Sequence, residues 1–140
     1  LAEKVLRKAH GRLSPYLIPK SREGAIKMAR VLKDGGHLAI MIDQKLNEGI
    51  TIPFFGRPAK TTTALAAFAL RHRCPIIPAR VERIAGATFR VIFHPPIQLP
   101  NSGDTVRDTE LIMLNANQII ENWIRDTPSQ WLWLHRRWGK

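Results

Sequence analysis

The sequence predicts an α/β fold in which a mixed, largely parallel sheet is flanked by helices. The main observation is segment 37–43 (His-Leu-Ala-Ile-Met-Ile-Asp), a nearly continuous apolar run that follows two glycines. Such a run is typical of a strand that is buried on both faces, as in parallel sheets covered by helices. Helical periodicity before and after this segment gives the order helix-strand-helix-strand-strand-helix, which indicates an α/β domain.

The predicted helices combine an apolar face with recognisable end signals. Ser21 can cap one helix at its N-terminus, and Gly35-Gly36 can end it. The run Thr61-Thr62-Thr63 suits the start of another helix. Pro128 ends the last helix, in which apolar residues recur every three or four positions. The predicted helices cover residues 1–12, 22–33, 61–73 and about 108–126.

The remaining strands are shorter and interrupted by prolines. Residues 50–55 (Ile-Thr-Ile-Pro-Phe-Phe) read as a short extended segment. Residues 75–82 and 88–94 are rich in β-branched and apolar side chains, and Ala85-Gly86-Ala87 lies between them. This arrangement predicts a β-hairpin.

The composition narrows the possible partners. The chain has 22 Lys and Arg residues against 11 Asp and Glu residues, a formal net charge of +11. Such a charge favours nucleic acid, an anionic membrane surface or a phosphate-bearing substrate. The single cysteine, Cys74, excludes an internal disulfide, and no apolar run reaches the roughly 18 residues of a transmembrane helix. No metal-ligand spacing or nucleotide-binding glycine loop occurs, so we expect neither a metal nor a cofactor.

Asp43 and Gln44 are the first candidate site residues. They follow the predicted buried strand, and ligands of open α/β sheets bind beyond the carboxyl ends of the strands. A carboxylate there can orient a catalytic base, accept a proton or hold a polar headgroup. The alternative is an Asp that only forms a turn.

Two further candidates suit an anion. The hydroxyls of Thr61 and Thr62 precede a predicted helix, whose N-terminal N–H groups favour phosphate. Simple helix capping is the alternative. Arg80 follows the segment Pro75-Ile-Ile-Pro-Ala and can bind phosphate with a two-pronged guanidinium, or can pair with Glu82 or Glu110.

The C-terminal tail, residues 130–140, interleaves tryptophans with basic residues. Indole rings and arginines suit the headgroup region of a membrane. The same mixture suits single-stranded nucleic acid, and indoles can also dock into the protein core. The predicted membrane-interface residues are Trp131, Trp133, Arg136, Arg137 and Trp138.

Several of these motifs together resemble the lipid A biosynthesis (lauroyl/myristoyl) acyltransferases, within the glycerolipid (lysophospholipid) acyltransferase-like superfamily. In chain order they are Asp43-Gln44, the Phe-Phe-Gly-Arg-Pro-Ala of residues 54–59, the threonine run and the Pro-Ile-Ile-Pro-Ala-Arg of residues 75–80. The tail sequence Pro-Ser-Gln-Trp-Leu-Trp-Leu-His-Arg-Arg-Trp, residues 128–138, completes the likeness. The resemblance covers about residues 12–138 and is to the C-terminal portion of the family.

The resemblance implies an acyltransferase that moves a fatty acyl chain from acyl carrier protein to a hydroxyl of a lipid A precursor. The expected place is the cytoplasmic face of the cell inner membrane, with an anionic membrane surface, rather than nucleic acid, as a further partner. It implies that Asp43 is catalytic, that Gln44, Thr61, Thr62 and Arg80 bind substrate, and that residues 1–140 form the C-terminal part of a single acyltransferase domain.

The family's His-x4-Asp/Glu motif, in which the histidine is the general base, has no counterpart here. None of the five histidines is followed five residues later by a carboxylate. We therefore expect a fold that is incomplete at the N-terminus and a chain that does not catalyse transfer alone. The alternatives are a basic nucleic-acid-binding module and a non-catalytic membrane-docking module.

Overall fold

A computed structural model describes residue 18, residues 21–134 and residues 136–139. The chain divides into two compact units, residues 1–39 and residues 40–140, which are described separately below. The predicted helix over residues 1–12 lies outside the described residues.

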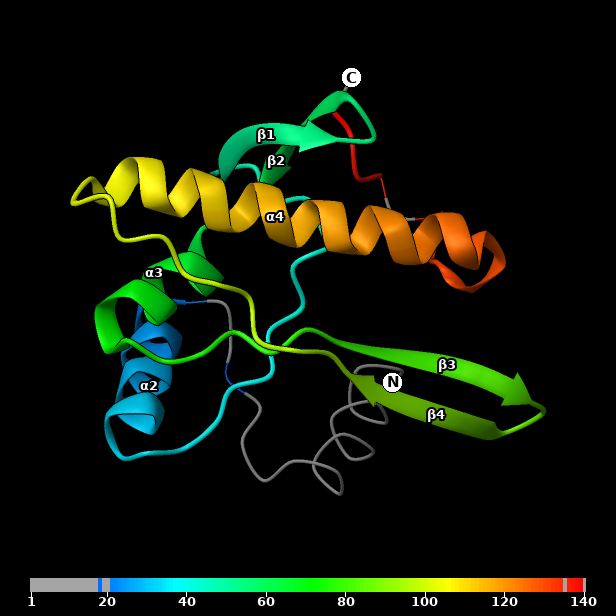
Figure 1. Ribbon diagram of the computed structural model, residues 1–140, viewed down its shortest axis with the longest axis horizontal. Helices are drawn as coiled ribbons and strands as arrows, with labels where there is room; N and C mark the ends of the chain where they lie inside the picture. The colour runs from blue at the N-terminus through cyan, green and yellow to red at the C-terminus, as the bar shows by residue number, and fades with distance from the viewer. Residues whose placement is uncertain (1–17, 19–20, 135, 140) are drawn as a thin grey trace. The chain divides into compact units, whose positions relative to one another are not determined.

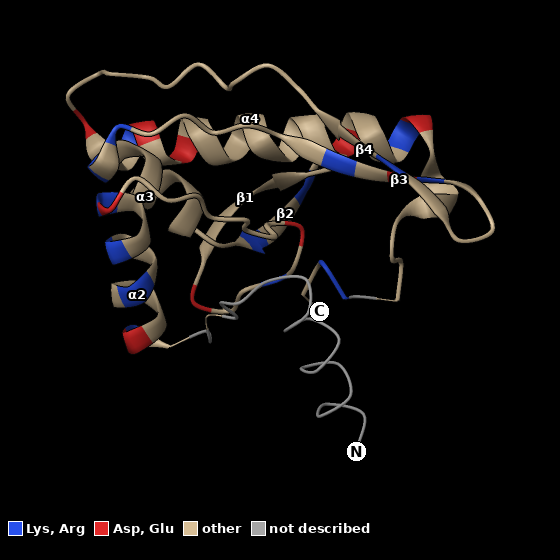
Figure 2. Ribbon diagram, turned by 90° about the horizontal axis from the view of Figure 1, so that it is seen from below, with Lys and Arg blue, Asp and Glu red and all other residues tan. Residues whose placement is uncertain are grey.

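The first unit contains helix α2, Arg22–Lys33, with the bounds that the sequence predicts. The Ser21 hydroxyl accepts a hydrogen bond from the backbone N–H of Gly24 at 3.1 Å, so the predicted cap is confirmed. After Asp34, the chain turns at Gly35, whose φ of +76° is readily adopted only by glycine. The helix carries Arg and Lys residues along its length (Figure 2).

The second unit is organised around the long helix α4, Thr105–Asp126 (Figure 1). The Asp104 side chain caps this helix by accepting from the backbone N–H groups of Val106 and Arg107, so α4 starts about a turn earlier than predicted. Its buried residues Ile112, Met113 and Ala116 form a core cluster with alanines of helix α3, Ala64–His72. Helix α4 therefore supplies the apolar surface on which the rest of this unit packs.

Strands β1, Ile50–Phe54, and β2, Arg57–Thr61, form an antiparallel hairpin against α4. The two-residue turn between them is Phe55-Gly56, and both residues have positive φ, as a type I′ turn requires. Phe55 is held in this uncommon conformation because its N–H donates to the Glu121 carboxylate on α4 at 2.8 Å. A second bond, from the Asn117 amide to the Pro53 carbonyl oxygen at 2.9 Å, fixes β1 on the same helix.

Strands β3, Ala79–Ala85, and β4, Thr88–Phe93, form a second antiparallel hairpin around Gly86, as the sequence predicts. Its strands extend away from the α3–α4 contact (Figure 1). An isolated bridge between Ile76 and Ile97 closes its base. These two isoleucines belong to the core cluster, so the base of the hairpin is anchored in the core.

The prediction of a largely parallel sheet is wrong for the described residues, although the mixture of helix and strand is confirmed. Both sheets there are two-stranded and antiparallel. The reason is the length of the connections. Two residues join each pair of strands, and such short links can join only antiparallel neighbours, whereas parallel strands need a crossover of a dozen or more residues.

Segment 37–43 also differs from the prediction, because it is not assigned as a strand. Within this extended run Ile42 packs against the core cluster, whereas Met41 is 74% exposed. A strand exists only when ladder hydrogen bonds join it to a neighbour. Apolar residues alone therefore identified an extended segment but not its pairing.

The predicted helix over residues 61–73 is shorter at its start, because Thr61 is the last residue of β2. Strand β2 itself was not predicted. It approaches the preceding loop closely: a Cβ at Gly49 would collide with the carbonyl oxygen of Thr61. In the part of the chain that the structure describes, no helix is both long and apolar enough to cross a membrane.

Candidate functional site

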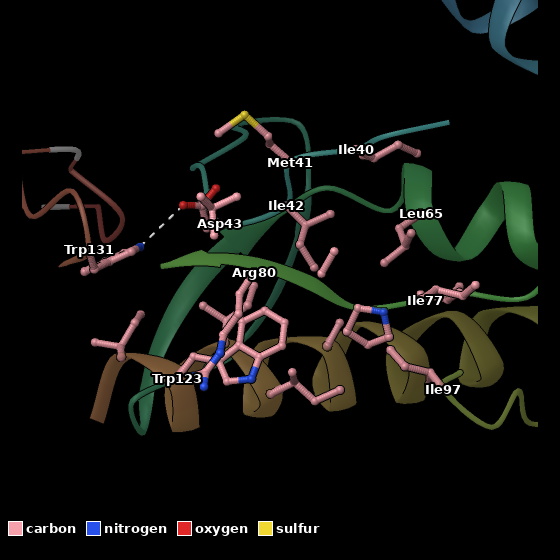
Figure 3. Close-up of a pocket in the computed structure, with 18 of the residues that line it drawn as sticks. Ile40, Met41, Ile42, Asp43, Leu65, Ile77, Arg80, Ile97, Trp123 and Trp131 are labelled. Atoms are coloured by element: carbon pink, nitrogen blue, oxygen red, sulfur yellow. Dashed lines mark hydrogen bonds between the residues drawn. The ribbon is translucent and has the colours of Figure 1, made fainter. Parts of the chain in front are cut away.

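The second unit contains a cavity of about 560 Å³ between α4, segment 40–43 and the chain leading into β3 (Figure 3). This volume falls within the ~300–1,000 Å³ typical of small-molecule sites. Most of its wall is aliphatic, and side chains from distant parts of the sequence meet there. The aliphatic lining residues include Ile40, Ile42, Leu65, Ile76, Ile77, Ile97, Ile119 and Ile120.

Asp43 lies at one end of this cavity, at the end of the apolar segment as the sequence predicts. Its carboxylate is half-buried and accepts a hydrogen bond from the indole N–H of Trp131, with Oδ2 and Nε1 3.4 Å apart (Figure 3). The bond joins residues 88 positions apart. The tail therefore orients one oxygen of the carboxylate beside an apolar space.

Arg80 lines the same cavity from β3, so the structure brings Asp43 and Arg80 to one site. Its Nη2 lies 2.7 Å from Glu82 Oε1, and its Nη1 lies 3.7 Å from Asp126 Oδ2. The guanidinium also lies 5.8 Å from the centre of the Trp123 ring. Arg80 thus pairs with Glu82, one of the two partners considered from the sequence. Its buried Nε and Nη1 make no hydrogen bond within the described residues.

Arg137 is completely buried, which the sequence did not indicate. Its Nη1 donates to the carbonyl oxygen of Lys60 at 2.8 Å, its Nη2 donates to the Thr61 hydroxyl at 2.6 Å, and its guanidinium lies 4.9 Å from the centre of the Phe54 ring. Burial lowers the pKa of Arg137 from its usual value, and the negative charge of Asp43 partly offsets this by raising it.

The burial of Arg137 bears on two site predictions. Thr61 is also completely buried, and its hydroxyl donates to the Ala59 carbonyl oxygen while it accepts from Arg137. In this arrangement the Thr61 hydroxyl joins β2 to the tail. Arg137 likewise faces the protein interior, contrary to its predicted place at a membrane interface.

The other predicted residues lie in different surroundings. The Thr62 hydroxyl accepts from the backbone N–H of Ala64 at 3.2 Å, which is the capping role considered from the sequence. Gln44 is half-buried beside Asp43. Of the predicted substrate-binding residues, Arg80 alone is among those that line the cavity.

The C-terminal tail connects several parts of this unit, and it divides into two kinds of residue. Trp131 and Trp138 are half-buried and pack around Phe54, and the Trp138 indole donates to the Phe54 carbonyl oxygen at 3.1 Å. Trp133 and Arg136 are exposed. Two of the three tryptophans in the tail motif thus have the core-docking role that the sequence left open.

Sequence reasoning missed two residues of the site. Trp123 lines the cavity from α4 and stacks near both Arg80 and His94, whose ring centre is 5.0 Å away. The sequence predicted the helix that contains Trp123, about residues 108–126, but gave no sign of the cavity. Gln130 also lines the cavity and is the last residue of the short 3-10 helix η1, Pro128–Gln130; no sequence pattern distinguished it.

The described residues contain no group of three or more His, Cys, Asp or Glu side chains that could hold a metal ion. The polar side chains that line the cavity are those of Asp43, Arg80, Glu82, Thr127 and Gln130, beside the indoles of Trp123 and Trp131.

Comparison with known proteins gives the context of this site. No curated protein matches the chain significantly. The family model for bacterial lipid A biosynthesis acyltransferases, in contrast, matches residues 5–140. The match includes Asp43, Arg80 and the whole tail up to its last residue. The chain therefore belongs to the bacterial lipid A biosynthesis acyltransferase family.

Proposed function

We propose that this chain forms the acceptor-side wall of an acyltransferase site, in which a fatty acyl chain passes from acyl carrier protein to a hydroxyl of a lipid A precursor. The observation that carries the proposal is the placement of Asp43 at the end of an aliphatic cavity, with Arg80 in the same wall. The family supplies the reaction class, and the cavity supplies a place for its apolar substrate.

The aliphatic walls suit an acyl chain. Each methylene that leaves water for an apolar environment contributes about 0.8 kcal/mol. A chain that lies along the isoleucines of the cavity would gain this for most of its length, and its carbonyl end would then lie near the polar groups. In this arrangement the reacting carbon lies at the end of the cavity where the Asp43 carboxylate is held by Trp131.

The proposed role of Asp43 is to orient the acceptor hydroxyl or the base that deprotonates it. A carboxylate held by one indole N–H retains acceptor capacity for a second donor. A hydroxyl or an imidazole N–H is a suitable second donor. The general base itself is not assigned to this chain, because no His-x4-Asp/Glu sequence occurs in it.

Two measurements test this function. The purified chain, incubated with acyl carrier protein loaded with a lauroyl group and a lipid A precursor, should give no labelled product. Product formation by the chain alone would overturn the proposal that the base lies elsewhere. A chimera in which residues 12–138 replace the matching part of an active family member should transfer the acyl group.

In this chimera, Asp43→Asn should lower kcat by about 100-fold or more, the range by which a positioned acid–base group accelerates a reaction. The fold should be unchanged, because the amide oxygen can still accept from Trp131. Asp34→Asn, at an exposed carboxylate that follows α2, is the matched control. An Asp43→Asn chimera with unaltered kcat would remove Asp43 from the mechanism.

Arg80 is proposed to bind an anionic part of a substrate, a phosphate of the acceptor being the candidate. Its Nε and Nη1 have unused hydrogen-bonding capacity, and its negative partner Glu82 occupies only Nη2 closely. Arg80→Gln should raise KM for the acceptor with little change in kcat. The exposed Arg71→Gln on α3 is the control.

The proposed location is the cytoplasmic face of the cell inner membrane, where both substrates meet. The net charge of +11 suits an anionic lipid surface as well as the acidic acyl carrier protein. The exposed Trp133 and Arg136 are the tail residues proposed to meet the headgroups.

A further inference from the structure

The β3–β4 hairpin has its apolar and polar faces in an unusual arrangement. The cross-strand pairs Ala79–Phe93, Val81–Val91 and Arg83–Phe89 place five apolar side chains and one arginine on one face. Val81, Phe89, Val91 and Phe93 are 52–74% exposed. We call this set, together with Arg83, the hairpin face.

The opposite face of the same hairpin carries three charged residues and Ile92, and all of these except Arg90 are half-buried. Arg80 and Glu82 lie there and form an ion pair, and Arg80 reaches toward Trp123 and Asp126 of α4. Two-stranded sheets normally turn their apolar side chains inward, because that burial is what stabilises them. Here the charged residues face α4, and the apolar face is left in water.

The charge of the hairpin face is positive. Its one ionisable residue, Arg83, lies with its guanidinium 5.1 Å from the centre of the Phe89 ring. Arg90 and the acidic Glu82 face each other across the strands on the opposite face, where Glu82 also forms an ion pair with Arg80. An arginine above an exposed phenylalanine can keep its charge at the headgroups while its aliphatic part follows the ring into apolar surroundings.

A second exposed apolar segment is joined to this hairpin by Gln130. The Gln130 side-chain amide binds both backbone groups of Arg83: Oε1 accepts from the N–H at 2.8 Å, and Nε2 donates to the carbonyl oxygen at 3.3 Å. The next exposed residues of the tail are Leu132, Trp133 and Leu134. We call the two bonds of Gln130 the clamp, and they hold the start of the exposed tail segment beside the hairpin.

We propose that the hairpin face, with the exposed tail residues Leu132, Trp133 and Leu134, docks onto an anionic lipid bilayer. Phenylalanine, tryptophan and leucine would enter the headgroup region, and Arg83 would contact lipid phosphates. The docking is interfacial rather than deep. Backbone groups at a free strand edge must stay hydrated, because hydrocarbon offers them no hydrogen-bond partner.

The hairpin face is also continuous with the cavity, since Val81 belongs to both. Under the proposed acyl transfer, a lipid acceptor could move from the bilayer along β3 into the cavity without exposing its acyl chains to water. This last step rests on the proposed function. The docking itself does not, because it concerns only the exposed side chains and the bilayer.

Vesicle sedimentation of the 140-residue chain tests the docking. The probes are vesicles of phosphatidylethanolamine with phosphatidylglycerol, and vesicles of phosphatidylcholine alone. We expect binding to the anionic vesicles, and weaker binding when salt rises from about 0.1 M to about 0.5 M. Phe89→Ser and Phe93→Ser should each weaken binding about tenfold. Arg83→Gln should weaken it about fivefold.

Val106→Ser is the matched control, because Val106 is 71% exposed at the start of α4, far along the sequence from the hairpin. Arg107→Gln is the control for charge. Both should bind vesicles like the unaltered chain. Circular dichroism checks that each variant is folded. Arg83→Gln tests the charge of the hairpin face, and Phe93→Ser separately tests its apolar side chains.

Three outcomes would overturn the proposal. The first is equal binding of the phenylalanine variants and the controls, and the second is no binding of the unaltered chain to anionic vesicles. The third is a dimer of the unaltered chain that Phe93→Ser dissociates in sedimentation velocity, since that would assign the hairpin face to a second copy. Asp43→Asn should bind vesicles normally, so a failure of docking and a failure of the acyltransferase function are distinguishable.

Discussion

The two hairpins of the second unit have the same topology and opposite burial. In β1–β2, Ile52, Phe54, Ala59 and Thr61 alternate inward and are buried. In β3–β4, the described strands contain no buried residue. The difference shows that hairpin formation and hairpin burial are decided separately. Turn residues and strand propensity form both hairpins, whereas contacts with α4 and the tail bury only the first.

The two hairpins differ in burial because they receive different numbers of long-range hydrogen bonds from side chains. Side chains of Asn117, Glu121, Arg137 and Trp138 all bind the backbone of β1–β2, or of its turn. Among the described residues, Gln130 is the one side chain that binds the backbone of the second hairpin in this way. Satisfied buried polar groups and apolar packing thus occur together in the first hairpin and are sparse in the second.

The largest effect should come from the buried phenylalanine next to the turn of the first hairpin. Phe54 is completely buried and packs against the rings of Trp131 and Trp138. Phe54→Ala should lower the free energy of unfolding by about 3–5 kcal/mol, measured by urea denaturation. Phe93→Ala, on the exposed hairpin, should change it by no more than about 0.5 kcal/mol. Similar losses in both variants would contradict the comparison.

A smaller effect is expected from the buried arginine of the tail. Arg137→Ala removes the donors that satisfy the Lys60 carbonyl oxygen and the Thr61 hydroxyl. We expect a loss of about 2–3 kcal/mol in urea denaturation, since each unsatisfied buried group costs about 1–3 kcal/mol and the relieved desolvation of the charge offsets part of this. The neighbouring Arg136→Ala, at an exposed side chain, should have almost no effect. Equal stability of the two variants would show that the buried bonds contribute nothing.

The smallest effect should come from the clamp on the exposed hairpin. Gln130→Ala should cost about 0.5–1 kcal/mol, because both of its bonds lie at an exposed site. Its local effect is more specific: the amide of Arg83 should exchange with deuterium faster, while the amides of β1 are unchanged. Gln118→Ala, whose side chain bonds only to Asn122 on the same helix, is the control. Unaltered exchange at Arg83 would mean that the clamp does not restrain the hairpin.

The sequence identified individual candidate residues of the site, but it did not predict how they are arranged in space. Asp43 and Arg80 were both identified, from a carboxylate after an apolar run and an arginine after paired prolines. That they line one cavity follows from the packing of β3 and segment 40–43 around α4, which no local pattern encodes. Arg137 was misjudged because a basic residue among tryptophans looks the same in sequence whether it faces lipid or a carbonyl oxygen.

The sequence by itself determined several local elements: α2 with its Ser21 cap, the turn around Gly86 and the apolar face of α4. Caps, turns and periodicity act over a few residues, so they can be read from neighbouring positions. Only the tertiary structure decided the pairing of the strands, the interior position of Arg137 and the outward apolar face of β3–β4. These depend on partners tens of residues away, such as the 88-residue separation between Asp43 and Trp131. The long-range contacts therefore decide which apolar surface is buried and which remains for a partner.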